Sequence, residues 1–246
     1  MKIPAMTDRP DKRMLICAGA YWLVCFLLEP IFLLYLVYGY YDDAVVLGWV
    51  QMVYYVINAV CTVFIFKHHI ADGFFTLQVE PKRFWTTIAL CLGLFFGFMG
   101  LAWVISLVLP IFGIFAEFFT VLPAVELEVF MMPAQLVQTH PLLGTLCVTL
   151  AAPITISGLV YGLGFAPACE KDPLLGYAVG IGILILHRNM NYYTTGTIPL
   201  EMTLFICQLP LHLCGFIAYH RTNSIWGPMV FLGVSNLLAC VLMLVL

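Results

Sequence analysis

Charged residues are scarce in this chain. Asp, Glu, Lys and Arg make up 9% of the 246 residues, whereas soluble domains carry about 25%. Apolar residues make up 63%, so a soluble domain of this length would lack the polar surface to cover itself. The composition therefore excludes a soluble globular domain and predicts an integral membrane protein that lies in the lipid bilayer.

Other absences narrow the class further. The alternation typical of barrel strands is missing, because the apolar runs are continuous for about twenty residues; the predicted fold class is all-α. The nine cysteines form no CxxC pair and no cluster with histidine, which favours buried reduced thiols over disulfides or zinc. A net charge of −3 indicates no nucleic-acid partner. We expect no metal and no cofactor.

The apolar runs predict a polytopic bundle of about seven membrane-spanning helices. The fifth run is short, about fifteen residues, and must either be shielded by its neighbours or extend into the interface. The predicted spans are 14–38, 44–66, 84–112, 141–165, 173–187, 199–219 and 224–246.

Two polar stretches lie between the predicted spans. Residues 67–83 are expected to form an interfacial segment. Residues 113–140 hold several Glu and Gln residues and two prolines, and form either an external loop or a helix that re-enters the interface. With seven spans, nine of the ten Lys and Arg residues fall on one side and only Arg188 on the other, which predicts a multi-pass protein of the cell membrane with a cytoplasmic N-terminus. No cleavable signal peptide is expected, because the first apolar run is too long for one.

The stretch 151–188 organises the chain. Two apolar runs are joined by a short turn that carries Glu170, Lys171 and Asp172. Small residues recur four positions apart, at 158 and 162 in the first run and at 176 and 180 in the second, so the runs are predicted to pack closely as a hairpin.

Polar residues inside the spans are few. Glu29, before Pro30, is either a hydrogen-bonded kink residue or a transport site. Gln51 and Asn58 are predicted to make hydrogen bonds between helices. His212 lies near one helical face with Glu201, and a satisfied core histidine is the favoured interpretation.

The turn Tyr219–Pro228, with sequence YHRTNSIWGP, and the helix that follows it resemble the final motif of the CPBP (CAAX-processing and bacteriocin-processing, Abi) family of intramembrane proteases. Ala152-Pro153-Ile154 resembles the lead-in to the paired glutamates of that family, and 183–187 resembles its second motif. The resemblance covers about 71–246 and is strongest in the last third. It implies peptide-bond hydrolysis within the membrane and a CPBP-like core in the last four helices.

Carried over residue by residue, the resemblance implies that most catalytic groups are missing. The glutamate positions hold Ile156 and Ser157, the arginine position holds Tyr161, and the last histidine position holds Leu232. Without a carboxylate there is no evident general base.

Two motif positions keep the residue types of the family, His187 and Asn236. They do not make a metal site, since zinc needs three or four donors. Ser157 as a nucleophile, or a trio of His187, Glu201 and His212, are less favoured substitutes.

We therefore expect a cytoplasmic segment at 1–13, peripheral transmembrane helices with an interfacial loop at 14–140, and a CPBP-like four-helix core at 141–246. The expected function is that of a decayed pseudoprotease that binds a membrane-embedded or prenylated peptide or protein. The alternatives are a divergent active endopeptidase and, below it, a small transporter.

Overall fold

The computed structural model describes residues 19, 44–108, 137, 140–195 and 198–245. Within these residues every regular element is a helix, so the all-α prediction is confirmed for the described part of the chain. The helices are α2 (Ala44–Ile65), α3 (Lys67–Val79), α4 (Pro81–Val108), α10 (Pro173–Thr195), α11 (Ile198–Thr222), α12 (Trp226–Val245) and one long helix at Pro141–Cys169.

The long helix changes its winding twice and is called α7–α9 below. It begins as α7 (Pro141–Leu146) and widens into a π-helix, η2 (Cys147–Ala151). It continues as α8 (Ala152–Ile156), widens again as η3 (Ser157–Phe165) and ends as α9 (Ala166–Cys169). Each wide stretch ends just before a proline, Pro153 or Pro167. A proline lacks an N–H and its ring collides with the carbonyl four residues earlier, and a wider turn relieves that collision.

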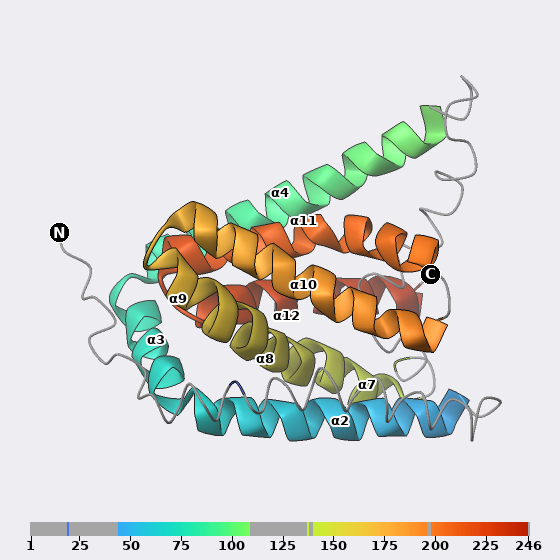
Figure 1. Ribbon diagram of the computed structural model, residues 1–246, viewed down its shortest axis with the longest axis horizontal. Helices are drawn as coiled ribbons and strands as arrows, with labels where there is room; N and C mark the ends of the chain where they lie inside the picture. Colours follow the sequence, from blue (N-terminus) through green and yellow to red (C-terminus); the bar gives the residue numbers. More distant parts are fainter. Residues whose placement is uncertain (1–18, 20–43, 109–136, 138–139, 196–197, 246) are drawn as a thin grey trace.

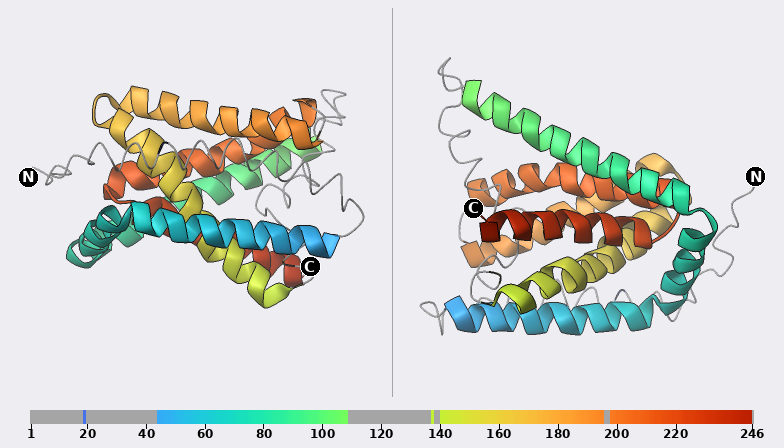
Figure 2. Two further views of the ribbon diagram at one scale, coloured as in Figure 1. Left: turned by 60° about the horizontal axis from the view of Figure 1, so that its bottom comes forward. Right: turned by 180° about the vertical axis from the view of Figure 1, so that it is seen from behind.

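Helix α12 lies at the centre of the bundle. It packs on α4 and α11 on one side and on η2 and α8 on the other (Figure 2). Helix α10 packs on α9, η3 and α11, and α2 lies along η2 and α8 at the opposite edge (Figure 1).

The main core unites these helices through buried aromatic residues. Phe165 stacks on Phe216 with ring centroids 4.8 Å apart, and Phe95 of α4 meets Phe231 of α12 edge-on at 6.3 Å. Because α4 contributes to the same core as α10–α12, side chains from both sides of residue 141 build it.

The outer surface is largely apolar. Large exposed side chains line α2 and α4, among them Val53, Ile57, Phe64, Leu94, Phe98 and Leu101. Two described helical stretches, Pro81–Leu101 and Pro141–Cys169, have the length and composition to cross a bilayer, and shorter apolar stretches lie in α2, α10 and α12. These features support membrane association. The number of spans and the orientation stay predictions.

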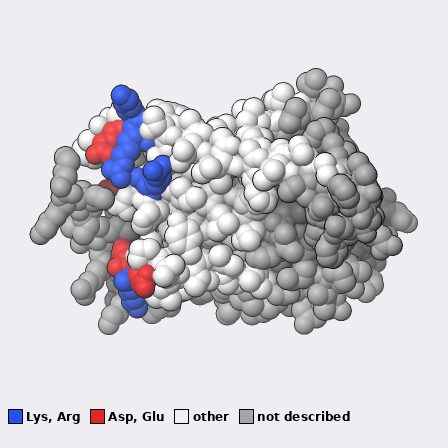
Figure 3. Space-filling model, turned by 90° about the horizontal axis from the view of Figure 1, so that it is seen from above, with Lys and Arg blue, Asp and Glu red and all other residues white. Residues whose placement is uncertain are grey.

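The described Lys, Arg, Asp and Glu side chains gather at one end of the molecule (Figure 3). This end is built from α3, the start of α4, the α9–α10 turn and the α11–α12 turn. None of these charged side chains is buried.

The helix boundaries lie close to those of the predicted spans, except at the end of the fifth. That span was predicted at 173–187 and α10 continues to Thr195, which fits a short span extended into the interface. Residues 188–195 contain no proline or glycine, and Gly196 is the first of these helix-breaking residues after position 187. The predicted first span and most of the segment 113–140 lie outside the described residues.

Candidate functional site

The turn that carries the CPBP-like motif has a local structural reason for most of its residues. Asn223 adopts a left-handed backbone with φ of 49°, which asparagine tolerates well. The Thr222 hydroxyl donates to the Ala218 carbonyl at 2.7 Å, and the Trp226 N–H donates to the Ser224 Oγ at 3.2 Å. These bonds end α11 and cap the start of α12.

The same turn is fastened to α3. The indole N–H of Trp226 donates to the Ile70 carbonyl at 2.7 Å, across 156 residues of sequence, and its ring lies 5.7 Å from that of Phe74. Gly73 fits against Ser224 and Trp226, where a Cβ would have no room. The motif therefore fixes α12 relative to α3.

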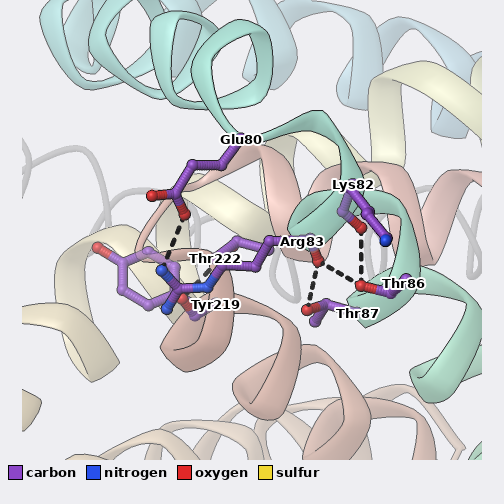
Figure 4. A network of polar contacts seen from close by, with 7 residues as sticks. All are labelled: Glu80, Lys82, Arg83, Thr86, Thr87, Tyr219 and Thr222. Atoms are coloured by element: carbon purple, nitrogen blue, oxygen red, sulfur yellow. Dashed lines mark hydrogen bonds and ion pairs between the residues drawn. The ribbon is translucent and has the colours of Figure 1, made fainter.

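The start of α4 joins this end of the molecule. Arg83 pairs with Glu80 at 2.9 Å, and the pair lies beside Tyr219 and Thr222 of α11 (Figure 4). Both charged side chains are partly exposed, so the pair contributes little to stability.

Ile156 and Ser157, which stand at the glutamate positions of the CPBP motif, lie where α8 passes into η3. Ile156 packs against the main core. Ser157 is completely buried, and its hydroxyl has no hydrogen-bond partner among the described residues. The Thr62 hydroxyl of α2 is in the same state, and Thr62 lies against Gly158.

Tyr161, which stands at the arginine position of the CPBP motif, makes an aromatic contact. Tyr161 is fully buried, and its ring meets that of Phe216 at 5.1 Å. Its hydroxyl lies 3.4 Å from Nδ1 of His212 and donates at 3.4 Å to the His212 carbonyl. Gly215 leaves room for this hydroxyl, since a Cβ there would collide with it. His212 is thus a buried histidine with a polar neighbour on η3, in accord with the favoured interpretation.

The last two motif positions lie on α12. Leu232 is buried in the main core. Asn236 is buried, and its side-chain N–H donates to the Val148 carbonyl at 2.9 Å.

The winding of η2 explains why that carbonyl needs a side-chain donor. The Ala152 N–H, which would reach Val148 in an α-helix, donates instead to Cys147. The next backbone position is Pro153, which has no N–H. Asn236 supplies the missing donor, and this satisfies a buried carbonyl.

His187, the histidine of the CPBP-like second motif, lies on α10. His187 lies within the helical part of the chain, but its side chain falls outside the described part, so the shared interior predicted for Ser157, His187 and Asn236 stays a prediction. Ser157 and Asn236 are both buried on helices that pack together.

The chemistry available at these positions is limited. Among the described residues no three His, Cys, Asp or Glu side chains are grouped to hold a metal ion, and no carboxylate is buried. Glu29 and the side chain of Glu201 lie outside the described residues. The described part of the site offers hydroxyls, an amide and an imidazole, without a carboxylate base.

Sequence reasoning missed the partners of these groups. Thr62, which lies against Gly158, comes from α2, and Val148, which accepts from Asn236, lies about 90 residues from it. By itself Pro153 predicts a carbonyl without a backbone donor at Thr149, four residues earlier. That Val148 needs a side-chain donor follows from the π-helical winding of η2, which the sequence did not predict.

Comparison with protein-family models, with curated proteins and with solved structures finds no match. The resemblance to the CPBP family rests on the residues quoted above.

Proposed function

We propose that this chain is a multi-pass membrane protein with a CPBP-like core in its last four helices, that its protease site has decayed, and that it binds a membrane-embedded or lipidated peptide. The observation that carries the proposal is the state of three motif positions. Tyr161 and Leu232 belong to the buried apolar core and Ile156 packs on it, where an active site would hold charged groups and a water molecule.

Physical chemistry supports this interpretation. An ionised group inside a bilayer costs about 2.5–3.5 kcal/mol on insertion scales, and catalysis is a reason to retain it. Once hydrolysis is no longer selected, apolar replacements at these positions improve packing. Aromatic and aliphatic side chains at Tyr161, Leu232 and Ile156 are the expected result.

Peptide binding is testable by photocrosslinking. A farnesylated peptide and a transmembrane peptide, each with a photoreactive group, would be irradiated with the purified protein in lipid nanodiscs. We expect saturable crosslinks that map to helices α7–α12 and that excess unlabelled peptide removes. Crosslinking that does not saturate would contradict binding.

The alternative is a divergent active endopeptidase. One observation favours it: the Ser157 hydroxyl, which has no hydrogen-bond partner in the part of the chain that the structure describes, lies one helical turn from Tyr161, which contacts His212. Ser157→Ala separates the two functions, because it should abolish turnover in an active enzyme and leave peptide binding unchanged in a pseudoprotease.

A further inference from the structure

A thiol and an imidazole meet at the charged end of the molecule, away from the site described above. Cys169 is the last residue of α9, and His220 lies in the last turn of α11. The Cys169 Sγ is 3.5 Å from Nδ1 of His220, across 51 residues of sequence. A nucleophile within hydrogen-bond reach of a base is the arrangement that activates a thiol.

The backbone around the pair holds it in place. Gly176 of α10 approaches Cys169 so closely that a Cβ would lie 2.8 Å from the Cβ of Cys169. The Leu174 N–H donates to the Asp172 carboxylate at 2.8 Å, which caps the start of α10. Both ends of the α9–α10 turn are therefore fixed next to the thiol.

Cys169 differs from the other described cysteines in its position. Cys91, Cys147, Cys214 and Cys240 are buried, and only Cys61 and Cys169 are partly exposed. Cys61 lies well inside α2, whereas Cys169 is followed at once by Glu170, Lys171 and Asp172. It is a thiol at the boundary between an apolar helix and a charged turn.

The residues around Cys169 suit the two parts of an acyl donor, an apolar acyl chain and a carrier that bears phosphate groups. Leu174 and Leu175 are 78% and 44% exposed, and they offer apolar surface at the start of α10 next to the thiol. Lys171 and Arg221 are exposed, and each follows a member of the pair within two residues, where it can meet phosphate groups.

We propose that Cys169 is an S-acylation site, which takes a long-chain acyl group from a coenzyme A thioester with His220 as the base. Juxtamembrane cysteines are the usual acceptors of this modification. The proposal goes beyond the proposed function and does not depend on it.

The step is a balanced exchange of thioesters. The Cys169 sulfur attacks the acyl carbonyl while His220 takes the thiol proton. The bond from the carbonyl carbon to the coenzyme A sulfur breaks, and the leaving thiolate recovers the proton from His220. Burial, and after it the carboxylates of Asp172 and Glu170, raise the pKa of the Cys169 thiol. The sulfur therefore needs a base to take its proton during the attack.

The experiment uses the purified full chain in detergent with palmitoyl-coenzyme A. Intact-mass spectrometry measures acylation, peptide mapping locates it, and release by neutral hydroxylamine identifies a thioester. We expect one acyl group on Cys169, loss of labelling in Cys169→Ser and unchanged labelling in the matched control Cys61→Ser.

The role of His220 needs a separate readout. His220→Ala should slow acylation by about 10²-fold, the lower range for a general base, and added imidazole should restore part of the rate. Acylation of the unmodified chain at Cys61, or no acylation at all, would contradict the assignment of Cys169 as the acceptor. An unchanged rate in His220→Ala would contradict the role of His220 as the base. Peptide mapping of the unmodified chain decides the site even if Cys169→Ser fails to fold.

Discussion

The side-chain amide of Asn236 on α12 donates to the Val148 carbonyl on η2 at 2.9 Å, and this bond replaces a backbone donor that Pro153 cannot supply. The residue that most resembles a catalytic asparagine thus has a structural role in this chain. It ties the central helix of the bundle to the distorted helix that carries Ile156 and Ser157.

Asn236→Ala should lower the thermal stability of the purified protein. The substitution leaves the buried Val148 carbonyl without its side-chain donor, which costs about 1–3 kcal/mol. Thermal unfolding in detergent measures the effect. Ser235→Ala is the matched control: its hydroxyl bonds within its own helix, to the Phe231 carbonyl, so we expect a smaller loss. Equal losses in the two variants would contradict the role given to Asn236.

Gly215→Ala should destabilise the protein by about 1–3 kcal/mol, because the new methyl group collides with the Tyr161 hydroxyl. The added substitution Tyr161→Phe removes that hydroxyl and should recover part of the loss. Gly182→Ala is the control, since no atom lies within 4 Å of a Cβ at that position. A Gly182→Ala variant as unstable as Gly215→Ala would show that the loss does not come from the collision.

Ile156→Glu should lower the melting temperature at neutral pH, because it places a carboxylate against an apolar core. A melting temperature unchanged by the substitution at neutral pH would show that a polar cavity persists at this position.

Trp226→Phe should weaken the attachment of α3. The substitution keeps most of the ring and removes the hydrogen bond to the Ile70 carbonyl, a loss of about 1 kcal/mol. We expect faster proteolysis within α3 and a lower melting temperature. Trp85→Phe changes a ring that is 53% exposed and should leave both readouts unchanged. If the two variants behave alike, the indole bond does not hold α3.

Much of the fold could be predicted from the sequence because it depends on continuous apolar runs. The run 44–66 predicts α2, observed as Ala44–Ile65, and the run from Pro141 predicts the start of α7. Helix α10 continues beyond the predicted span 173–187 to Thr195, because a helical backbone needs no apolar side chain to continue.

The candidate site was less predictable because its contacts join distant segments. Motif spacing predicts that Tyr161 stands at an arginine position of the CPBP motif, but its contact with His212 depends on how η3 and α11 pack. The π-helical turns arise from two prolines, and their effect on Val148 becomes visible only once α12 lies beside η2. The charge pattern predicted one side of the membrane for Lys82 and Lys171. The start of α4 and the α9–α10 turn, which carry them, lie at the same end of the molecule (Figure 1), and the orientation in the membrane stays a prediction.

A test of peptide hydrolysis addresses the central claim most directly. The purified protein in nanodiscs would be incubated with prenylated and transmembrane peptides beside His187→Ala, with cleavage followed by mass spectrometry. General acid–base groups contribute about 10²–10⁴-fold, and oxyanion donors about 10²–10³-fold each, so a CPBP-like site without the glutamates and one histidine would lack most of the catalysis. We predict no turnover by either protein. Turnover by the unmodified chain that His187→Ala abolishes would contradict the account and establish an active peptidase.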